Sequence, residues 1–341
     1  VMNGVARRII DRLGTKIGYL LTVVWWSSAE VLHVFARGPV SLGICRFLLG
    51  AGEAGNWPVA VKVVAEWFPE RERALAAGIF NSGSAFGALL APPAVAFLTL
   101  QYGWRWAFGL MGCLGFIWAA IWALFYRRPA SAAALVGPKP QPLPLRQFLR
   151  SRLIWQFTIA KIFVDPVWYF YTFWFPQYLK VSGGFSLKTI GETAWIPFLA
   201  ADLGNIVGGY VGGKMLKRFP SLDVARKVTI IFFLALMGAG TLAASIATTP
   251  VALALASVAT FGYTAALANM LALPADRVPS HTVASFWGFA SMGSGFGGML
   301  FSLVTGVLID RFSFSPVFVL FGGIPAIACW LIWTLPDEHY S

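Results

Sequence analysis

The chain has 341 residues, of which 58% are apolar and only 12% are charged, about half the charged share of an average soluble domain. This composition excludes a disordered chain, a collagen-like fibre, a disulfide scaffold and an ordinary soluble enzyme. It indicates an all-α polytopic membrane protein. The net charge of +12 does not indicate a nucleic-acid partner, because the charges lie in short runs between long apolar stretches, as membrane anchors do.

Ten segments are long and apolar enough to be membrane-spanning helices, which need about 20 mostly apolar residues. Residues 1–18 are expected to be the end of an earlier helix and a basic loop, and the polar, Pro-rich residues 127–152 a linker. The linker separates an N-terminal bundle, 1–126, from a C-terminal bundle, 153–341. The predicted spans are 19–36, 42–67, 74–99, 104–126, 153–179, 189–216, 224–247, 251–273, 283–308 and 316–335.

The distribution of Lys and Arg between these spans predicts their orientation. Eighteen lie on the side of the linker and five on the opposite side. Because cytoplasmic loops of membrane proteins are enriched in Lys and Arg, we expect the linker and the C-terminus in the cytoplasm.

The two halves repeat each other. Residues 65–90 align without a gap with residues 275–300, and the identities include Pro69, Phe86 and Gly87. A shared bias toward small residues is the alternative, but Pro and Phe at a fixed register favour a parallel repeat. The repeat predicts six spans in each half of the intact protein, with the first helix and most of the second missing here.

Charged residues within spans are the strongest functional signal, because each costs about 2.5–3.5 kcal/mol on insertion scales. Arg46 and Glu53 are two helical turns apart and share one face of their helix. We expect Arg46 to supply a fixed positive charge, and Glu53 to take up and release a proton near the midplane. Asn56 extends the polar face. The alternative is that Arg46 and Glu53 only pair with neighbouring helices.

The second half has a similar group of candidates. Lys161 and Asp165 lie one turn apart, and Asp165 is a second candidate for proton coupling, unless the two residues simply neutralise each other at a helix interface. Carboxylates, amides and aromatic rings nearby would suit a sugar or another polyol. The candidate contacts are Trp168, Tyr169, Thr172, Asp202 and Asn205.

Two helices rich in small residues are expected to pack closely and slide against their neighbours. Ser84 and Ser294 fit that packing role. Asn81 in the first of these helices, and its repeat partner Ser291 in the second, are candidate substrate contacts.

Several long motifs resemble a known family. DRLGTKIGY (11–19) is similar to the loop between the second and third helices of the major facilitator superfamily. RFLLGAGEAGNWPVAVKVVAEWFPERERALAAGIFNSGS (46–84) resembles the fourth and fifth helices of its anion:cation symporter family. Three further segments are most similar to hexuronate transporters: KIFVDPVWYFYTFWFPQYL (161–179), WIPFLAADLGNIVGG (195–209) and SFWGFASMGSGFGGMLFS (285–302).

The resemblance implies two six-helix bundles around a central cavity and proton-coupled uptake of an organic anion by alternating access. The family's fourth-helix Arg and Glu correspond to Arg46 and Glu53, and the Glu is held to couple protons. The expected substrate is a hexuronate such as galacturonate or glucuronate, carried with protons and without a cofactor by a monomer in the bacterial inner membrane. Another organic anion (an aldonate, a glucarate or an aromatic acid) and a transport-inactive sensor or scaffold are the alternatives.

Overall fold

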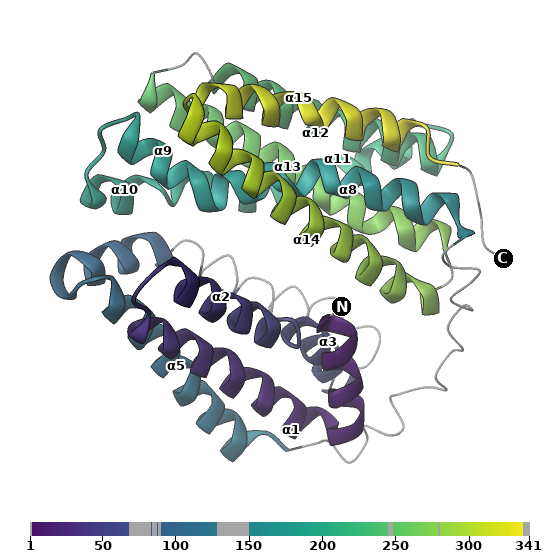
Figure 1. The fold of residues 1–341 in the computed structure, drawn as a ribbon. Helices are drawn as coiled ribbons and strands as arrows, with labels where there is room; N and C mark the ends of the chain where they lie inside the picture. The colour runs from purple at the N-terminus through teal and green to yellow at the C-terminus, as the bar shows by residue number, and fades with distance from the viewer. Residues whose placement is uncertain are drawn as a thin grey trace. The chain divides into compact units, whose positions relative to one another are not determined.

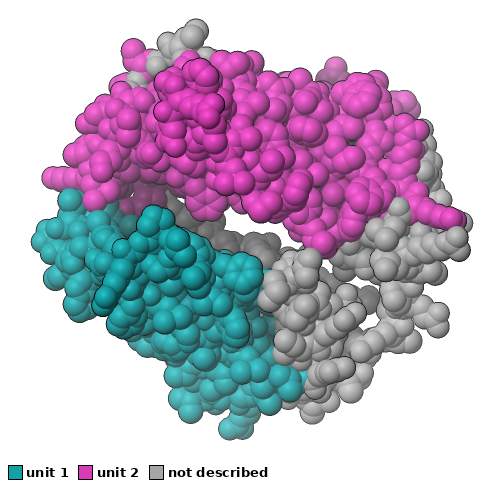
Figure 2. All heavy atoms as spheres, in the orientation of Figure 1, with its two compact units in different colours: residues 1–87, 93–139 teal, residues 88–92, 140–341 magenta. Residues whose placement is uncertain are grey.

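The computed structural model describes residues 2–67, 83, 87, 90–127, 150–244, 248–278 and 280–336, and every regular element within these ranges is helical. Asn81, most of the predicted linker and most of the first copy of the repeat lie outside the described residues. The chain divides into two compact units, coloured separately in Figure 2. Unit 1 comprises residues 1–87 and 93–139, and unit 2 comprises residues 88–92 and 140–341.

Unit 1 is built around α1, which packs against each of the other long helices of the unit. Gly14 in α1 has a positive φ of 79°, a conformation that glycine adopts without a steric penalty. It divides α1 into a short first segment and a long second one (Figure 1). The elements of the unit are α1 (Met2–Leu32), η1 (His33–Phe35), α2 (Pro39–Glu53), α3 (Asn56–Trp67) and α5 (Trp104–Phe125), and residues 90–102 are also helical.

The predicted span 42–67 is two helices rather than one. The turn at Ala54 and Gly55 separates α2 from α3. The sequence accounts for the break, because a proline at position 58 has no N–H to bond the carbonyl of Ala54. Glu53 is therefore the last residue of α2 and Asn56 the first residue of α3.

Unit 2 is centred on α8, which packs against α14 and α15 through an aromatic core that includes Phe157, Phe170 and Phe318. Pro166 lies inside α8, and a π-helical turn follows it at Phe170–Trp174. The predicted span 153–179 is therefore α8, this turn and α9. The helices are α8 (Arg152–Tyr169), α9 (Phe175–Val181), α10 (Leu187–Thr193), α11 (Ile196–Arg218), α12 (Leu222–Ala244), α13 (Thr249–Arg277), α14 (Ser280–Arg311) and α15 (Ser315–Trp333).

Small residues bring the helices of unit 2 into close contact, as membrane helices require. Gly208 of α11 lies against the backbone of Ala265 in α13, and Thr260 of α13 donates a 2.7 Å hydrogen bond to the Pro197 carbonyl of α11. Gly293 and Gly297 of α14 lie against α8 in the same way. The close packing expected of the Gly-rich helix 283–308 is present.

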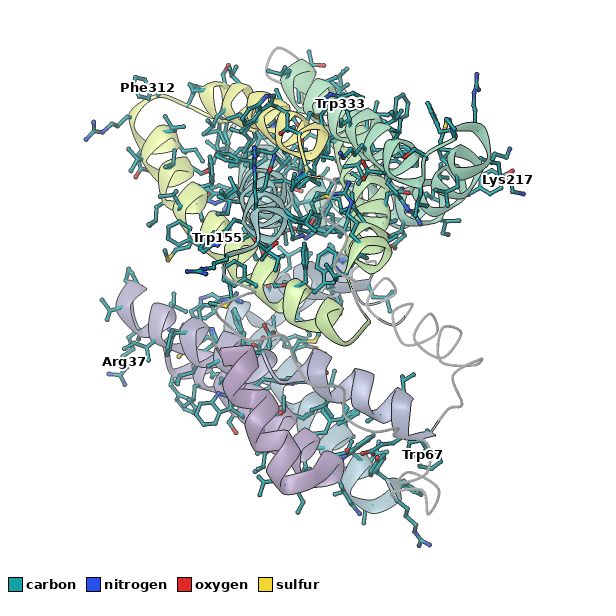
Figure 3. All side chains as sticks on the ribbon, turned by 90° about the vertical axis from the view of Figure 1, so that its right-hand side faces the viewer. Arg37, Trp67, Trp155, Lys217, Phe312 and Trp333 are labelled. Carbon is teal, nitrogen blue, oxygen red and sulfur yellow. The ribbon has the colours of Figure 1, made fainter. Side chains whose placement is uncertain are left out.

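Five helices within the described ranges are long and apolar enough to cross a bilayer: Leu13–Phe35, Trp104–Phe125, Pro250–Leu273, Phe286–Arg311 and Ser315–Trp333. Many of their large apolar side chains are exposed, including Trp106, Leu303 and Trp330, as contact with lipid requires. Figure 3 shows Arg37 and Trp67 at opposite ends of unit 1, and Phe312 and Lys217 on opposite sides of unit 2. The chain is a multi-pass helical membrane protein.

Candidate functional site

In unit 1 the candidate residues lie where α1 and α2 run antiparallel. Gly55, in the turn after α2, lies against Thr22 of α1, and Gly52 of α2, three residues earlier, lies against Trp25 and Trp26. A side chain at Gly52 would collide with both tryptophans, so glycine sets how closely these helices approach. This register determines which charged residues become neighbours.

Arg46 is exposed, and its guanidinium lies over the ring of Phe108 in α5 at 5.4 Å from the ring centroid. Across the part of the chain that the structure describes, no carboxylate forms an ion pair with Arg46. Its donors are therefore available to a carboxylate ligand, which a guanidinium binds through two parallel hydrogen bonds.

Glu53 is also exposed, at the C-terminal end of α2, and its charge interacts with that of Arg46, two helical turns earlier. Asn56 follows the helix break and accepts a 2.8 Å hydrogen bond from the Tyr19 hydroxyl at its Oδ1. The seven-residue spacing thus places two exposed charges of opposite sign on one helix, α2.

In unit 2, Asp165 and Lys161 form a buried ion pair within α8. Lys161 Nζ is 2.9 Å from Asp165 Oδ2, and the two residues are only 4% and 3% exposed. Tyr263 of α13 donates a 3.2 Å hydrogen bond to Asp165 Oδ1, and Lys161 lies 5.3 Å from the centre of the Trp287 ring. Lys161 and Asp165 thus neutralise each other in this arrangement, which is the alternative that the sequence left open.

The aromatic candidates continue along α8. Trp168 stacks on Tyr263 with 5.1 Å between ring centroids, and the Tyr169 hydroxyl is 3.5 Å from Ser294 Oγ. Thr172 is in the π-helical turn and donates to the Trp168 carbonyl. All three candidates are partly exposed, so each keeps a surface for a ligand.

The remaining candidates are more dispersed. Asp202 is half-buried and Asn205 exposed on α11, and Ser291 is exposed on α14. Two residues that sequence reasoning left out of the site belong to its surroundings: Tyr263, which bonds Asp165, and Glu30. The internal repeat offered a signal for Tyr263, since it is the position equivalent to Glu53.

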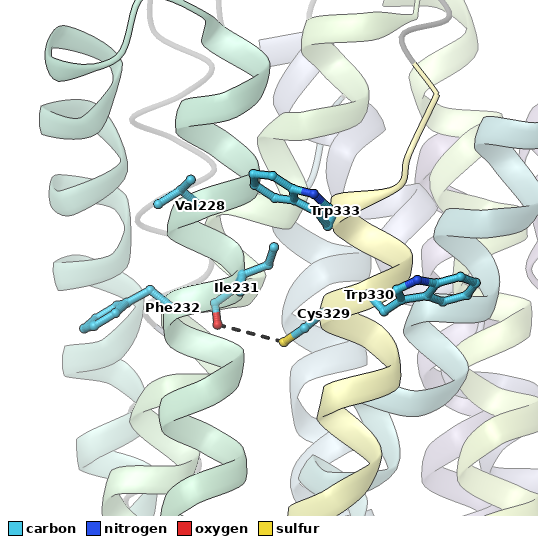
Figure 4. A pocket seen from close by; sticks show the side chains of 6 residues that line it. All are labelled: Val228, Ile231, Phe232, Cys329, Trp330 and Trp333. Atoms are coloured by element: carbon cyan, nitrogen blue, oxygen red, sulfur yellow. Dashed lines mark hydrogen bonds between the residues drawn. The ribbon is translucent and has the colours of Figure 1, made fainter.

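A pocket of about 500 Å³ lies between α12 and α15 (Figure 4). Its lining carries no charged side chain, so it does not suit an anionic substrate. The lining residues are Val228, Ile231, Phe232, Cys329, Trp330 and Trp333.

The membrane-length helices define a multi-pass membrane protein. The family model of the Major Facilitator Superfamily matches residues 1–223 and 203–341. The chain therefore belongs to the Major Facilitator Superfamily, as the sequence motifs predicted.

Named relatives and a solved structure agree with this assignment. The chain is 34% identical to the hexuronate transporter of Escherichia coli K12, over 98% of this chain and 82% of the relative. It is also 34% identical to the galacturonate transporter of Dickeya chrysanthemi, over 71% and 75% of the two chains. The crystal structure of a D-xylose-proton symporter matches with a TM-score of 0.77 at 15% identity, over 98% of this chain and 84% of that one, a similarity of fold alone.

Proposed function

We propose that the protein is a proton-coupled symporter that takes up a sugar-acid anion, a hexuronate such as galacturonate or glucuronate, by alternating access. The observation that carries this proposal is the exposed guanidinium of Arg46, which has no ion pair among the described residues. The names of the relatives, a hexuronate and a galacturonate transporter, support the substrate class.

Arg46 binds the substrate carboxylate, and Glu53 carries the proton. A hexuronate is a monoanion at neutral pH, and moving it inward against an inside-negative potential costs about 2.3 kcal/mol per 100 mV. Co-transport of one proton makes the inward movement of the substrate electrically neutral. Co-transport of two protons gives it a net positive charge, so that the membrane potential drives uptake. Protonation of Glu53 frees Arg46 to receive the sugar, and substrate release inside lets the proton leave. The bundles then rock against each other.

The hydroxyl groups of the sugar require hydrogen-bonding partners, and the C–H face of its ring can stack on an aromatic side chain. Trp168, Tyr169 and Thr172 are partly exposed along α8 and its π-helical turn. Asp165 remains a proposed second proton-coupling residue. The other proposed substrate contacts are Asn56, Asn81, Asp202, Asn205 and Ser291.

Uptake by proteoliposomes tests this function. Labelled galacturonate and glucuronate, an aldonate, a glucarate and an aromatic acid are each supplied with and without an inward proton gradient. Gradient-driven accumulation of a hexuronate in preference to the others supports the proposal. Preference for another acid favours the alternative anion symporter, and no uptake of any acid favours a sensor or scaffold.

We also propose a bacterial inner-membrane location for the monomer, with the linker and the C-terminus in the cytoplasm. The excess of Lys and Arg on that side supports this orientation. Single cysteines placed at Arg37 and at Lys217, in a variant without the three native cysteines, test it with a membrane-impermeant thiol reagent on intact cells. Arg37→Cys should react and Lys217→Cys should not.

A further inference from the structure

The charge of a second carboxylate, Glu30, also interacts with Arg46. Glu30 of α1 is one helical turn beyond Trp26 on the same face, and Trp26 packs against Gly52 of α2. Because α1 and α2 are antiparallel, a step along α1 corresponds to a step backwards along α2, which brings Glu30 level with Arg46. No direct ion pair joins these two residues, but their charges interact, and the charge of Glu53 interacts with both.

Other charged and titratable groups of unit 1 make the following contacts. His33 stacks on Phe108 at 4.6 Å, and its Nδ1 donates to the Ala29 carbonyl. Arg105 of α5 donates to the Val34 and Ala36 carbonyls. Glu66 of α3 bonds Thr15, about 22 Å along α1 from Glu30. Within the described part of the unit, the charge of Glu30 interacts with His33 on its own side and with Arg46 of α2, and of these two only the guanidinium stays charged at every pH at which the protein works.

We propose that Glu30 is the counter-ion of Arg46 in the transport cycle: it does not pair with the guanidinium in this structure, but it interacts with its charge and competes for it with the carboxylate of the substrate. This inference rests on the proposed function. Glu30, Arg46 and Glu53 together carry one excess negative charge when both carboxylates are ionised. An arriving anion would add a second, so substrate binding and protonation of these carboxylates favour each other.

The outcome of this competition for Arg46 differs between the two sides of the membrane, because their pH differs. On the more acidic side, protonated Glu30 releases Arg46 to the substrate. On the more alkaline side, ionised Glu30 takes Arg46 back and displaces the substrate. Glu30 thus lowers affinity where release is required, and loss of its charge should tighten binding while slowing release.

The test is exchange of labelled D-galacturonate by the full chain in proteoliposomes, at equal pH on both sides. Compared with the wild type at mildly alkaline pH, Glu30→Gln should lower KM about fivefold or more and also lower Vmax. At mildly acidic pH the two KM values should converge. In Glu30→Asp the carboxylate reaches less far toward Arg46, so KM should also decrease, but by less than in Glu30→Gln. This second variant tests the inference if Glu30→Gln does not fold. Glu192→Gln, which removes an exposed carboxylate on α10, should change nothing.

A KM in Glu30→Gln that keeps the wild-type dependence on pH, or that rises at both pH values, would overturn the inference while leaving the proposed function in place. Absence of exchange by the wild type at either pH would overturn the proposed function and this inference with it.

Discussion

Tyr263 of α13 donates a 3.2 Å hydrogen bond to Oδ1 of Asp165 in α8, the same oxygen that accepts from Lys161 at 3.1 Å. Tyr263 also stacks on Trp168, one of the proposed substrate contacts. A single phenol ring thus connects the buried ion pair of unit 2 to its aromatic surface.

Replacement of Tyr263 by Phe should destabilise the protein by about 1 kcal/mol, because one hydrogen bond within the membrane is lost while the ring remains. Unfolding in detergent micelles with increasing denaturant measures the change. Tyr210→Phe, at an exposed position of α11, is the comparison away from the ion pair. An unchanged stability would show that the hydroxyl contributes nothing to holding Asp165.

The Lys161–Asp165 pair can be tested as a unit. Asp165→Asn or Lys161→Met alone should each destabilise the protein by about 3–5 kcal/mol, because each leaves a buried charge without its partner. The double variant should recover most of this loss, since it buries no charge. Gradient-driven uptake by the folded double variant would argue against proton coupling through Asp165, whereas loss of accumulation with retained exchange would support it.

Glu53→Gln should abolish proton-driven accumulation of a hexuronate and spare substrate exchange, because the amide cannot carry a proton but keeps the shape of the carboxylate. Proteoliposomes assayed for uptake and for exchange measure both. The exposed Glu192→Gln is again the control, with both activities intact. Accumulation that survives in Glu53→Gln would assign proton coupling to another group.

Arg46→Lys should raise the KM for hexuronate exchange about tenfold or more, although the charge is kept. Lysine cannot form the two parallel hydrogen bonds that a guanidinium makes with a carboxylate. Initial rates of exchange over a range of substrate concentrations give KM and Vmax. Arg311→Lys, at the end of α14, should leave KM at the wild-type value. An equal KM in Arg46→Lys would mean that Arg46 supplies charge alone.

Gly208→Val should destabilise unit 2 by about 1–3 kcal/mol, because a side chain at this position meets the Ala265 backbone and the helices must separate. Gly209→Val is the matched control, since a side chain there meets no atom within 4 Å. Denaturant unfolding of both variants in detergent measures the difference. Equal stability of the two would show that α11 and α13 can move apart without cost.

The sequence alone could predict those features of the fold that depend on residues within one segment. Long apolar segments predicted the helices, but the predicted span 42–67 missed the break at Ala54 and Gly55. Hydropathy averages over a window and does not register the missing N–H of Pro58, although the proline itself was visible. Prediction of the candidate site followed the same pattern: Arg46 and Glu53 were found because both lie on one helix, whereas Glu30 and Tyr263 come from other helices.

The sequence by itself determined the class of protein, its helical character and its superfamily. A bilayer requires long apolar helices, because each backbone N–H and C=O group must be hydrogen-bonded within its own segment. Whether a segment meets this requirement depends on its own residues, so the sequence shows it directly. Only the tertiary structure decided that Tyr263 holds Asp165 and that Glu30 stands level with Arg46. Those neighbours depend on the register of packed helices, which contacts such as Gly52 against Trp25 set between residues far apart in the chain.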